Sequence, residues 1–558
     1  MRFSRFLNFI LPVITFLVLA ACATIVTPSG GEKDVTPPRL LSSDPKNQST
    51  AFTGKRLVMN FDEYIQLKDM DKNLLISPPL NKDPDIKIKG RSLIVKLNDT
   101  LRSNTTYSFY FGQGVTDLTE GNPMSNFSLA FSTGNVIDSL GMSGYVTDAY
   151  TRLPIKNALV ELYTDMADSA PMLTRPVYVS RTNETGKFIL RNLAAGKYRM
   201  IALSDGDNNY MYNLPTEQVA FEDSLVEPYY ITPPKNDTIA IVVDSTRQFA
   251  LNMFTEPDSI QRVKCSMIAP HQMLFTYRYP TTHSGIMPLN IDSTANWSIK
   301  EFSRNNDSVT CWLLGSLPDS LHFRMSDKGK ILDTLIASTT YKPKFSAKKN
   351  QVIDSTLKIQ QLSSRAGFLD WGSDYYITLA NPLSQLNTGA VRLILTATHD
   401  TLIPPIQFTD SIHRRAVIHY AWKTEEDYAL LFPKGMFRDI YNHINDSARV
   451  GFKLRSKDEY GQFRLMVKMK EGSPPKIIQL LDEKGGVLQQ HIVYKSQKVD
   501  FGFLSPAKFG LKVIYDDNGN GRWDTGIFLK RKQPEKVSVH PKVFEVRGNW
   551  ELEEEWEL

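Results

Sequence analysis

The stretch Tyr107-Ser108-Phe109-Tyr110-Phe111 decides the fold class, because the residues of one parity in it are all large aromatics. Residues 57–61, 93–97 and 127–131 show the same alternation of large apolar side chains with other residues. A period of two puts one set of side chains on one face of an extended chain, which indicates short strands with one buried face. Such runs recur along nearly the whole chain, and no run predicts a helix of about ten residues or more. We therefore expect an all-β protein of serial Ig-like and transthyretin-like β-sandwich domains.

The size and charge of the chain restrict its class. Its 558 residues suggest about three to five domains. Hydrophobic residues make up 41% and charged residues 22%, as in ordinary globular domains. The formal net charge of +5 is small for this length, which argues against a dedicated nucleic-acid-binding protein.

The N-terminus has the form of a secretory signal peptide. Arg2 and Arg5 are the only charged residues before Glu32, and an apolar run over residues 6–19 follows them. This run is too short and too interrupted for a transmembrane helix, which needs about 20 apolar residues. We expect residues 1–21 to be the export signal.

The signal ends in Leu19-Ala20-Ala21-Cys22, which resembles the lipobox of bacterial lipoproteins. The resemblance implies that Cys22 becomes the acylated N-terminus, with several acyl chains as an effectively permanent membrane anchor. The alternative is an ordinary signal peptide with an unrelated cysteine near its cleavage site. No later stretch of about 18 apolar residues predicts a second membrane segment.

The stretch from Ala23 to Pro38 contains Pro28, Ser29, Gly30, Gly31, Pro37 and Pro38, which predicts an extended linker over residues 22–36. The linker contains Glu32-Lys33-Asp34, and some envelope lipoproteins carry acidic signals near the lipidated cysteine that send them to the cell surface. The alternative is a solvated charge cluster. We expect an outer-membrane protein, on the cell surface rather than the periplasmic face.

The first domain is expected over residues 37–135. It opens with Pro37-Pro38, continues with Phe61-Asp62-Glu63 and closes with Phe131-Ser132-Thr133-Gly134. This resembles the bacterial Ig-like domain of the S-layer type. The resemblance implies a spacer or adhesion unit and names no substrate.

The second domain is expected over residues 140–225. Gly144-Tyr145-Val146-Thr147-Asp148, Thr185-Gly186-Lys187-Phe188 and Leu193-Ala194-Ala195-Gly196-Lys197-Tyr198 resemble the carboxypeptidase regulatory-like module, a transthyretin-like sandwich. The family resemblance implies a module that accompanies carboxypeptidases without being their catalytic domain.

The C-terminus, residues 471–558, repeats part of this module. Leu193 aligns with Leu504, an offset of 504 − 193 = 311 residues, and the alignment continues without gaps to Asn213. Asp205 then meets Asp516, and Asn209 meets Asn520. We interpret this as an internal repeat of two transthyretin-like sandwiches, each followed by the same polar loop.

The two loops are the metal-like constellations of the sequence. In the second loop, oxygen-bearing side chains stand at positions 1, 3, 5 and 9 of a calcium loop, with Gly521 at position 6: Asp516, Asn518, Asn520 and Asp524. The first loop keeps this spacing with other residues: Asp205, Asp207, Asn209 and Asn213. Tyr210 replaces the glycine there, so the second loop is the closer match.

Neither loop has the bidentate Glu of position 12, where Thr216 and Ile527 stand. We expect at most weak structural Ca²⁺ binding, in the ~10⁻⁴–10⁻³ M range of extracellular modules, and no other cofactor. The alternative is an Asx-rich turn that hydrogen-bonds its own backbone.

The middle of the chain is expected to contain a β domain over residues 230–345 and a second Ig-like domain over residues 346–470. Cys265 and Cys311 lie in the first of these. They could form a disulfide in an oxidising compartment or remain free, and the sequence leaves both alternatives open.

The last residues alternate between apolar and acidic side chains. Trp550, Leu552, Trp556 and Leu558 share one parity, and glutamates fill the other. This predicts a final strand at the edge of the last sandwich, with strand addition to a partner as the alternative.

No sequence motif of a zinc protease, a Ser hydrolase or a phosphate-binding loop occurs, so we expect no enzyme. The favoured function is a scaffold lipoprotein that docks on outer-membrane proteins or other lipoproteins of an assembly, secretion or uptake complex. The alternatives are a surface glycan-binding protein, with Trp312, Trp371 and Trp422 as candidate platforms, and an enzyme of unknown class.

Overall fold

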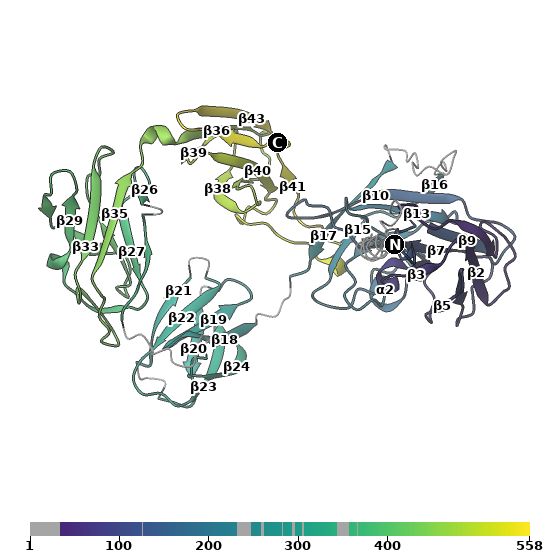
Figure 1. The fold of residues 1–558 in the computed structure, drawn as a ribbon, viewed down its shortest axis with the longest axis horizontal. Helices are drawn as coiled ribbons and strands as arrows, with labels where there is room; N and C mark the ends of the chain where they lie inside the picture. The colour runs from purple at the N-terminus through teal and green to yellow at the C-terminus, as the bar shows by residue number, and fades with distance from the viewer. Residues whose placement is uncertain are drawn as a thin grey trace, which may run out of the picture. The chain divides into compact units, whose positions relative to one another are not determined.

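The computed structural model describes residues 34–124, 127–230, 247–257, 262–281, 283–292, 296–303, 306–342, 356–364 and 367–558. Regular structure in this part is almost all β-strand, and its α-helices, α2 (Met70–Asn73) and α3 (Ala170–Leu173), have 4 residues each. The all-β class with serial Ig-like sandwiches is confirmed (Figure 1). The predicted signal peptide, Cys22 and most of the predicted linker lie outside the described residues. None of the described helices is long and apolar enough to cross a membrane.

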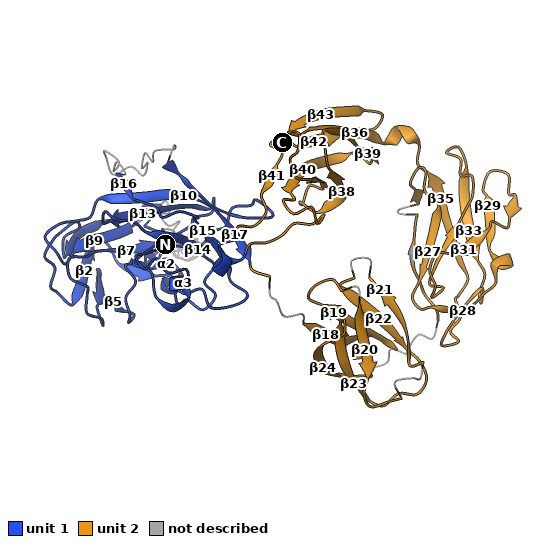
Figure 2. Ribbon diagram, turned by 180° about the vertical axis from the view of Figure 1, so that it is seen from behind, with its two compact units in different colours: residues 1–255, 527–532 blue, residues 256–526, 533–558 orange. Residues whose placement is uncertain are grey.

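The chain forms two compact units (Figure 2). Unit 1 contains residues 1–255 and the short segment Ile527–Lys532. Unit 2 contains residues 256–526 and 533–558.

The first sandwich of unit 1 has the sheet order β1-β2-β6-β5 and, on the other side of its core, β4-β7-β9, with the pair β3-β8 beside them. The strands are β1 (Leu40–Asp44), β2 (Arg56–Phe61), β3 (Ile65–Leu67), β4 (Leu75–Ser77), β5 (Asp85–Lys89), β6 (Ser92–Lys96), β7 (Thr106–Gly112), β8 (Val115–Asp117) and β9 (Phe127–Ser132). On β7, Tyr107, Phe109 and Phe111 are buried in the core and Tyr110 is 37% exposed, as the alternation predicts.

The second sandwich has the sheet order β12-β11-β14-β15-β17-β10-β13, with β16 paired to β10. Its strands are β10 (Leu140–Asp148), β11 (Leu159–Tyr163), β12 (Tyr178–Arg181), β13 (Lys187–Leu193), β14 (Arg199–Leu203), β15 (Gln218–Phe221), β16 (Tyr229–Tyr230) and β17 (Phe249–Thr255).

The predicted boundary near residues 225–230 is wrong. Strand β17 runs parallel to β10 and antiparallel to β15, so it closes the second sandwich and the domain ends at Thr255. Leu251 and Met253 of β17 are buried in the core of this sandwich. A strand that pairs with a partner about a hundred residues earlier leaves no local signal of that pairing, and sequence proximity assigned it to the following domain.

The two sandwiches of unit 1 pack against each other. Arg175 donates a hydrogen bond of 2.6 Å to the carbonyl oxygen of Leu80, and the backbone N–H of Val179 donates one of 3.1 Å to the Ser77 hydroxyl. Leu75 packs against Val179 in a small apolar cluster at this junction. These contacts make the junction a packed interface.

Segment Ile527–Lys532 leaves the C-terminal part of the chain and packs within unit 1. It contains the turn η4 (Phe528–Lys530). The aromatic ring of Phe528 contacts the rings of Tyr212 and Phe221, at distances between ring centroids of 5.4 and 5.7 Å. Arg531 pairs with Asp168 at 3.2 Å. Phe528 is 4% exposed, so the segment is anchored by a buried aromatic.

The third sandwich opens unit 2 with the sheets β18-β19-β22-β21 and β20-β23-β24. The strands are β18 (Val263–Ala269), β19 (Gln272–Tyr277), β20 (Ser284–Pro288), β21 (Ser298–Phe302), β22 (Ser308–Leu313), β23 (Ser320–Asp327) and β24 (Lys330–Ser338). Cys265 on β18 and Cys311 on β22 lie on either side of β19 and are free thiols.

The fourth sandwich has the sheets β25-β27-β32-β31 and β26-β35-β33-β29-β30, with the pair β28-β34. The strands are β25 (Ile359–Leu362), β26 (Phe368–Leu369), β27 (Tyr375–Leu379), β28 (Leu383–Leu386), β29 (Arg392–Leu395), β30 (Thr401–Leu402), β31 (Ile406–Phe408), β32 (Arg415–Ile418), β33 (Asp427–Phe432), β34 (Phe437–Asp439) and β35 (Ala448–Leu454). The 3₁₀ turns of unit 2 are η2 (Thr388–Ala390) and η3 (Lys457–Glu459).

The C-terminal sandwich has the sheets β39-β36-β43 and β38-β37-β40-β41, with β42 paired to β40. The strands are β36 (Gly461–Lys468), β37 (Lys476–Leu481), β38 (Val487–Val493), β39 (Gln497–Leu504), β40 (Ala507–Tyr515), β41 (Val537–Val539), β42 (Phe544–Val546) and β43 (Glu551–Glu557). Strand β36 supplies Phe463, Leu465 and Val467 to the core, so this domain begins near Gly461 and the predicted start at residue 471 is wrong.

Strand β43 pairs in parallel with β36 at the edge of its sheet, which confirms the predicted final strand. Leu552 and Trp556 pack against the core, while the glutamates of the other parity are exposed. Glu551 pairs with Arg464 at 3.2 Å, and Glu553 and Glu555 pair with Lys498 and Lys468. The acidic row is therefore partly matched by basic residues of β36 and β39.

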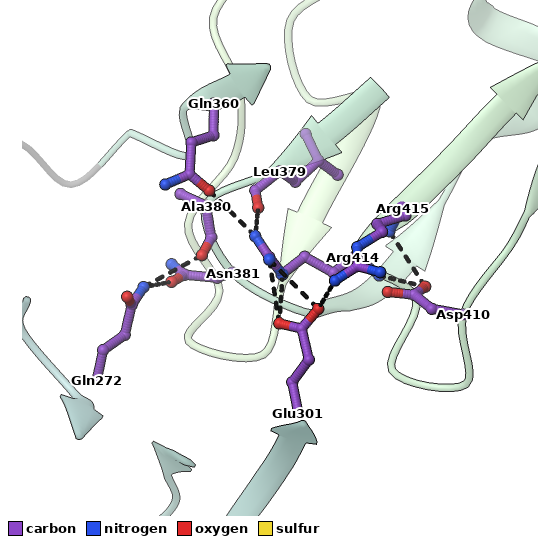
Figure 3. A network of polar contacts seen from close by, with 9 residues as sticks. All are labelled: Gln272, Glu301, Gln360, Leu379, Ala380, Asn381, Asp410, Arg414 and Arg415. Carbon is purple, nitrogen blue, oxygen red and sulfur yellow. Dashed lines mark hydrogen bonds and ion pairs between the residues drawn. The ribbon is translucent and has the colours of Figure 1, made fainter. Parts of the chain in front are cut away.

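A polar network joins the third and fourth sandwiches inside unit 2 (Figure 3). The guanidinium of Arg414 pairs with the Glu301 carboxylate at 3.0 Å and stacks on the Trp312 ring at 5.4 Å. Both charged side chains are largely buried, with 14% and 15% exposure. Gln272 adds a hydrogen bond of 2.8 Å to Asn381.

Candidate metal-binding loops

The two polar loops follow equivalent strands of the two repeated sandwiches. The first loop lies between β14 and β15, and the second lies between β40 and β41. In each sandwich the strand before the loop is central, because β14 pairs with β11 and β15, and β40 pairs with β37 and β41.

Both loops are organised around their first aspartate. In the first loop, the Asp205 carboxylate accepts backbone N–H groups from Asn209 at 3.3 Å and from Tyr210 at 2.9 Å. In the second, Asp516 accepts those of Asn520 at 3.0 Å and Gly521 at 2.8 Å. These are the same hydrogen bonds at an offset of 311 residues, so the loops share one backbone fold.

The backbone dihedrals agree with this equivalence. Position 6 has a positive φ in both loops, 62° at Tyr210 and 75° at Gly521. The left-handed region disfavours a residue with a Cβ, so Tyr210 holds this conformation at some cost. Its ring compensates by packing against Leu159 and Val179 on the outer face of the sheet.

A glutamate that sequence reasoning missed completes each loop. Glu217 accepts backbone N–H groups from Gly206 and Asn213, each at 3.0 Å. Glu535 accepts the corresponding groups of Asp517 at 3.1 Å and Asp524 at 2.9 Å. Each glutamate therefore closes its loop from the far end.

The position of these glutamates explains why the calcium-loop spacing did not find them. Glu217 stands one residue after position 12, next to Thr216. In the second loop, the short hairpin closed by the Ile527–Lys532 bridge intervenes, so Glu535 comes later. A buried Glu just after the loop was the available signal.

The first loop gathers three carboxylates, which we call the triad: Asp205, Asp207 and Glu217. One oxygen from each lies within 4.8 Å of the others. A hard cation with oxygen ligands at about 2.3–2.6 Å brings ligand atoms to such separations. The pKa of Asp205 is raised, chiefly by burial, while backbone hydrogen bonds oppose the shift and the nearby Asp207 carboxyl reinforces it.

Asn209 and Asn213, the other candidate ligands of the first loop, lie beside Asp207. Their amide groups donate to its carboxylate at 2.8 and 3.4 Å. The structure thus brings all four predicted first-loop residues together around one carboxylate cluster.

The second loop is arranged differently. The amides of Asn518 and Asn520 both donate to Asp524, the latter at 2.9 Å. Asp516 is fully buried, whereas Asp205 is half-buried, and both aspartates use their two oxygens to accept backbone N–H groups. Within the described residues, the triad is the one group of His, Cys, Asp or Glu side chains that meets metal-site spacing.

The tryptophans considered for glycan binding lie mostly inside the molecule. Trp312 is 2% exposed, and Trp422 packs against the core of the fourth sandwich. Trp371 is 38% exposed and packs edge-on against Phe503 at 4.9 Å. Trp422 is partly buried, so Trp371 is the most exposed of the three.

Comparison with known proteins supports the first domain. Residues 34–133 match the family model of the bacterial Ig-like domain. No curated protein matches the chain.

Solved structures match over much of the length at low similarity. A crystal structure of the S-layer protein SbsC is 12% identical, with coverage of 91% of this chain and 67% of that one and a TM-score of 0.14. The major pilin subunit BcpA of Bacillus cereus is 8% identical, with coverage of 75% and 98% and a TM-score of 0.15. A domain of a biofilm associated protein is 9% identical, with coverage of 88% and 96% and a TM-score of 0.15. Values this low establish neither a shared activity nor a shared location.

Proposed function

We propose that this protein is a non-catalytic scaffold of the bacterial outer membrane, acylated at Cys22, that docks on an envelope protein complex. The lipobox-like sequence Leu19-Ala20-Ala21-Cys22 supports the anchor. The match of residues 34–133 to the bacterial Ig-like domain supports a structural role by analogy with the fold.

The observation that carries the proposal is the construction of the junctions between sandwiches. Within unit 1, Arg175 hydrogen-bonds the Leu80 carbonyl across the first junction. Within unit 2, Arg414 pairs with Glu301 across the second. Paired charges and apolar contacts of this kind hold neighbouring domains in register, as a scaffold requires.

Acylation is tested by labelling growing cells with a radioactive or clickable fatty acid. We expect label in the wild-type protein and its recovery in the outer-membrane fraction. The Cys22→Ser variant should lose both. Label that persists in this variant would contradict the anchor.

Docking is tested by in-cell cross-linking, followed by purification from mild-detergent envelope extracts and mass spectrometry. We expect a stoichiometric outer-membrane protein or lipoprotein that is lost from the Cys22→Ser sample. Recovery of the protein alone after cross-linking contradicts the docking role. Binding to purified surface polysaccharide in that case would favour the glycan alternative, with Trp371 as its candidate platform.

A further inference from the structure

The first loop contains more negative charge than its own side chains can balance. The triad places Asp205, Asp207 and Glu217 around one point. Arg181 lies close enough to Asp205 to interact with it electrostatically and offsets one of these charges. Backbone N–H groups also stabilise Asp205 and Glu217, and a proton or a cation between the carboxylates would relieve the repulsion that remains.

A fourth carboxyl lies beneath the triad. Glu161 on β11 points to the outer face of the sheet, together with Leu159, against which the loop residue Tyr210 packs. Glu161 is fully buried; one of its oxygens accepts the Tyr163 hydroxyl at 2.9 Å and the other, Oε1, has no hydrogen-bond partner. Burial raises the pKa of this carboxyl to about 8, with smaller contributions from the nearby charges of Asp205 and Glu217.

An unsatisfied oxygen on a buried carboxyl is costly, and a bound ion is one way in which native proteins complete such a group. The open oxygen lies under the same loop that gathers the triad. These are independent observations: the loop gathers carboxylates that a cation would balance, and the strand below it holds a carboxyl oxygen that lacks a partner.

The second sandwich copy places its amides and charges differently. Glu161 pairs with Ile201 on the neighbouring strand, and Gln479 pairs with Lys512 in the C-terminal sandwich. Lys512 is the equivalent of Ile201 at the offset of 311, so Gln479 is the equivalent of Glu161. Asp207 corresponds to Asn518. The second copy thus has amides at these two positions, while it has a carboxyl, Asp524, where the first has the amide of Asn213.

The second copy also supplies its own positive charge. Lys476, only 4% exposed, lies close enough to Asp516 and Asp517 for their charges to act on it. Lys476 pairs with Tyr515, and the offset of 311 makes Ser204 the equivalent of Tyr515 in the first copy. The strand register there places Ala158 opposite Ser204, so Ala158 is the equivalent of Lys476. An internal ammonium therefore stands where the first copy has a methyl group.

We propose that the triad of the first loop, with the Glu161 carboxyl beneath it, binds one Ca²⁺ ion, and that the second loop binds none. Carboxylate oxygens from an irregular loop suit calcium, which accepts irregular coordination, better than magnesium, which demands near-ideal octahedral geometry. Gly521 makes the second loop the closer match to a calcium loop in sequence. The arrangement of the carboxylates instead favours the first loop as the calcium site.

The test is a count of bound calcium by equilibrium dialysis with radioactive CaCl₂ on the full mature chain after chelator treatment. We expect one ion per chain, in the ~10⁻⁴ M range, and much weaker competition by MgCl₂. Two ions per chain, or none at a few millimolar CaCl₂, overturns the proposal.

Matched variants exchange the residues of the two copies. Asp207→Asn gives the exposed position of the first loop the residue of the second and should weaken Ca²⁺ binding at least tenfold. Glu161→Gln does the same for the buried position. Asp524→Asn, which gives the second loop the Asn213 residue of the first, is the control and should leave the count at one.

A separate readout guards against unfolding. In the wild type, CaCl₂ at about ten times Kd should raise the apparent Tm of unit 1 by about 3 °C, and in Asp207→Asn it should not. The Tm of Asp207→Asn in chelator should not fall below that of the wild type, because Asp207 is exposed. Unchanged calcium binding in this variant overturns the assignment of the site.

Discussion

At the scale of single residues, burial decides the chemistry of the two cysteines. Burial raises the pKa of both Cys265 and Cys311 to about 12, and Cys311 is fully buried. Because the thiolate is the reactive form, both groups remain protonated and slow to react well above neutral pH.

We therefore predict that iodoacetamide at pH 8.5 modifies neither thiol in the folded chain within a time that fully modifies a free peptide thiol. In denaturant, both should react. The measurement is the mass of the intact protein, in a Cys22→Ser background. Rapid modification of folded Cys311 would show that the third sandwich opens.

The loop glutamates give a second prediction at this scale. Glu217 accepts N–H groups of Gly206, Asn213 and Leu214, so Glu217→Gln turns an amide toward donors and weakens charge-assisted hydrogen bonds. We expect a loss of about 1–3 kcal/mol in the free energy of unfolding of unit 1, measured in urea with chelator present. Glu184→Gln is the control: this exposed residue pairs only with Lys156, and its loss should be below about 0.5 kcal/mol.

The sequence predicted the loops but not their full residue sets. Asp205 and Asp516 were found because oxygen side chains at alternate positions form a local pattern. Glu161 was missed because it lies on a strand some forty residues earlier, and only the register of β11 against β14 places it under the loop. A contact made by strand pairing has no spacing rule in the sequence.

At the scale of elements, alternation predicted strands well and domain limits poorly. The β7 and β43 patterns were correct because each strand shows its two faces locally. The predicted domain limits were wrong at β17 and β36, because the side-chain patterns of these segments predict strands but do not show with which sheet each strand pairs. A strand belongs to the domain whose core its side chains enter, and that core consists of residues that lie far apart in the sequence.

The junction in Figure 3 provides a prediction at this scale. Arg414→Ala leaves the Glu301 carboxylate, only 15% exposed, without its main partner and removes the stack on Trp312. We expect a loss of about 2–4 kcal/mol in the unfolding of the third and fourth sandwiches, and their separation into two calorimetric transitions. Arg415→Ala is the control, since Arg415 is 49% exposed and should contribute less than about 1 kcal/mol.

A result in which both variants lose the same amount would contradict this account. It would mean that net charge near Glu301, rather than the buried contact of Arg414, holds the two sandwiches together.

At the scale of the whole molecule, segment Ile527–Lys532 belongs to unit 1 although its neighbours along the chain belong to unit 2. We predict that Phe528→Ala lowers the free energy of unfolding of unit 1 by about 3 kcal/mol, because it empties a buried aromatic site beside Phe221. Leu529→Ala is the control, since Leu529 is 52% exposed and should have little effect. Domain-resolved hydrogen exchange would show which unit responds, and a change confined to unit 2 would refute the assignment.

The same segment has a mechanical consequence. Tension applied between residue 34 and residue 533 can pass from unit 1 straight into Ile527–Lys532, which is held there by Phe528 and by the Arg531–Asp168 ion pair. Residues 256–526 lie between these two parts of unit 1 along the chain, so they bear no load until Ile527–Lys532 detaches. In a single-molecule pulling experiment, Ile527–Lys532 should therefore detach in one early step, before any sandwich within residues 256–526 begins to extend.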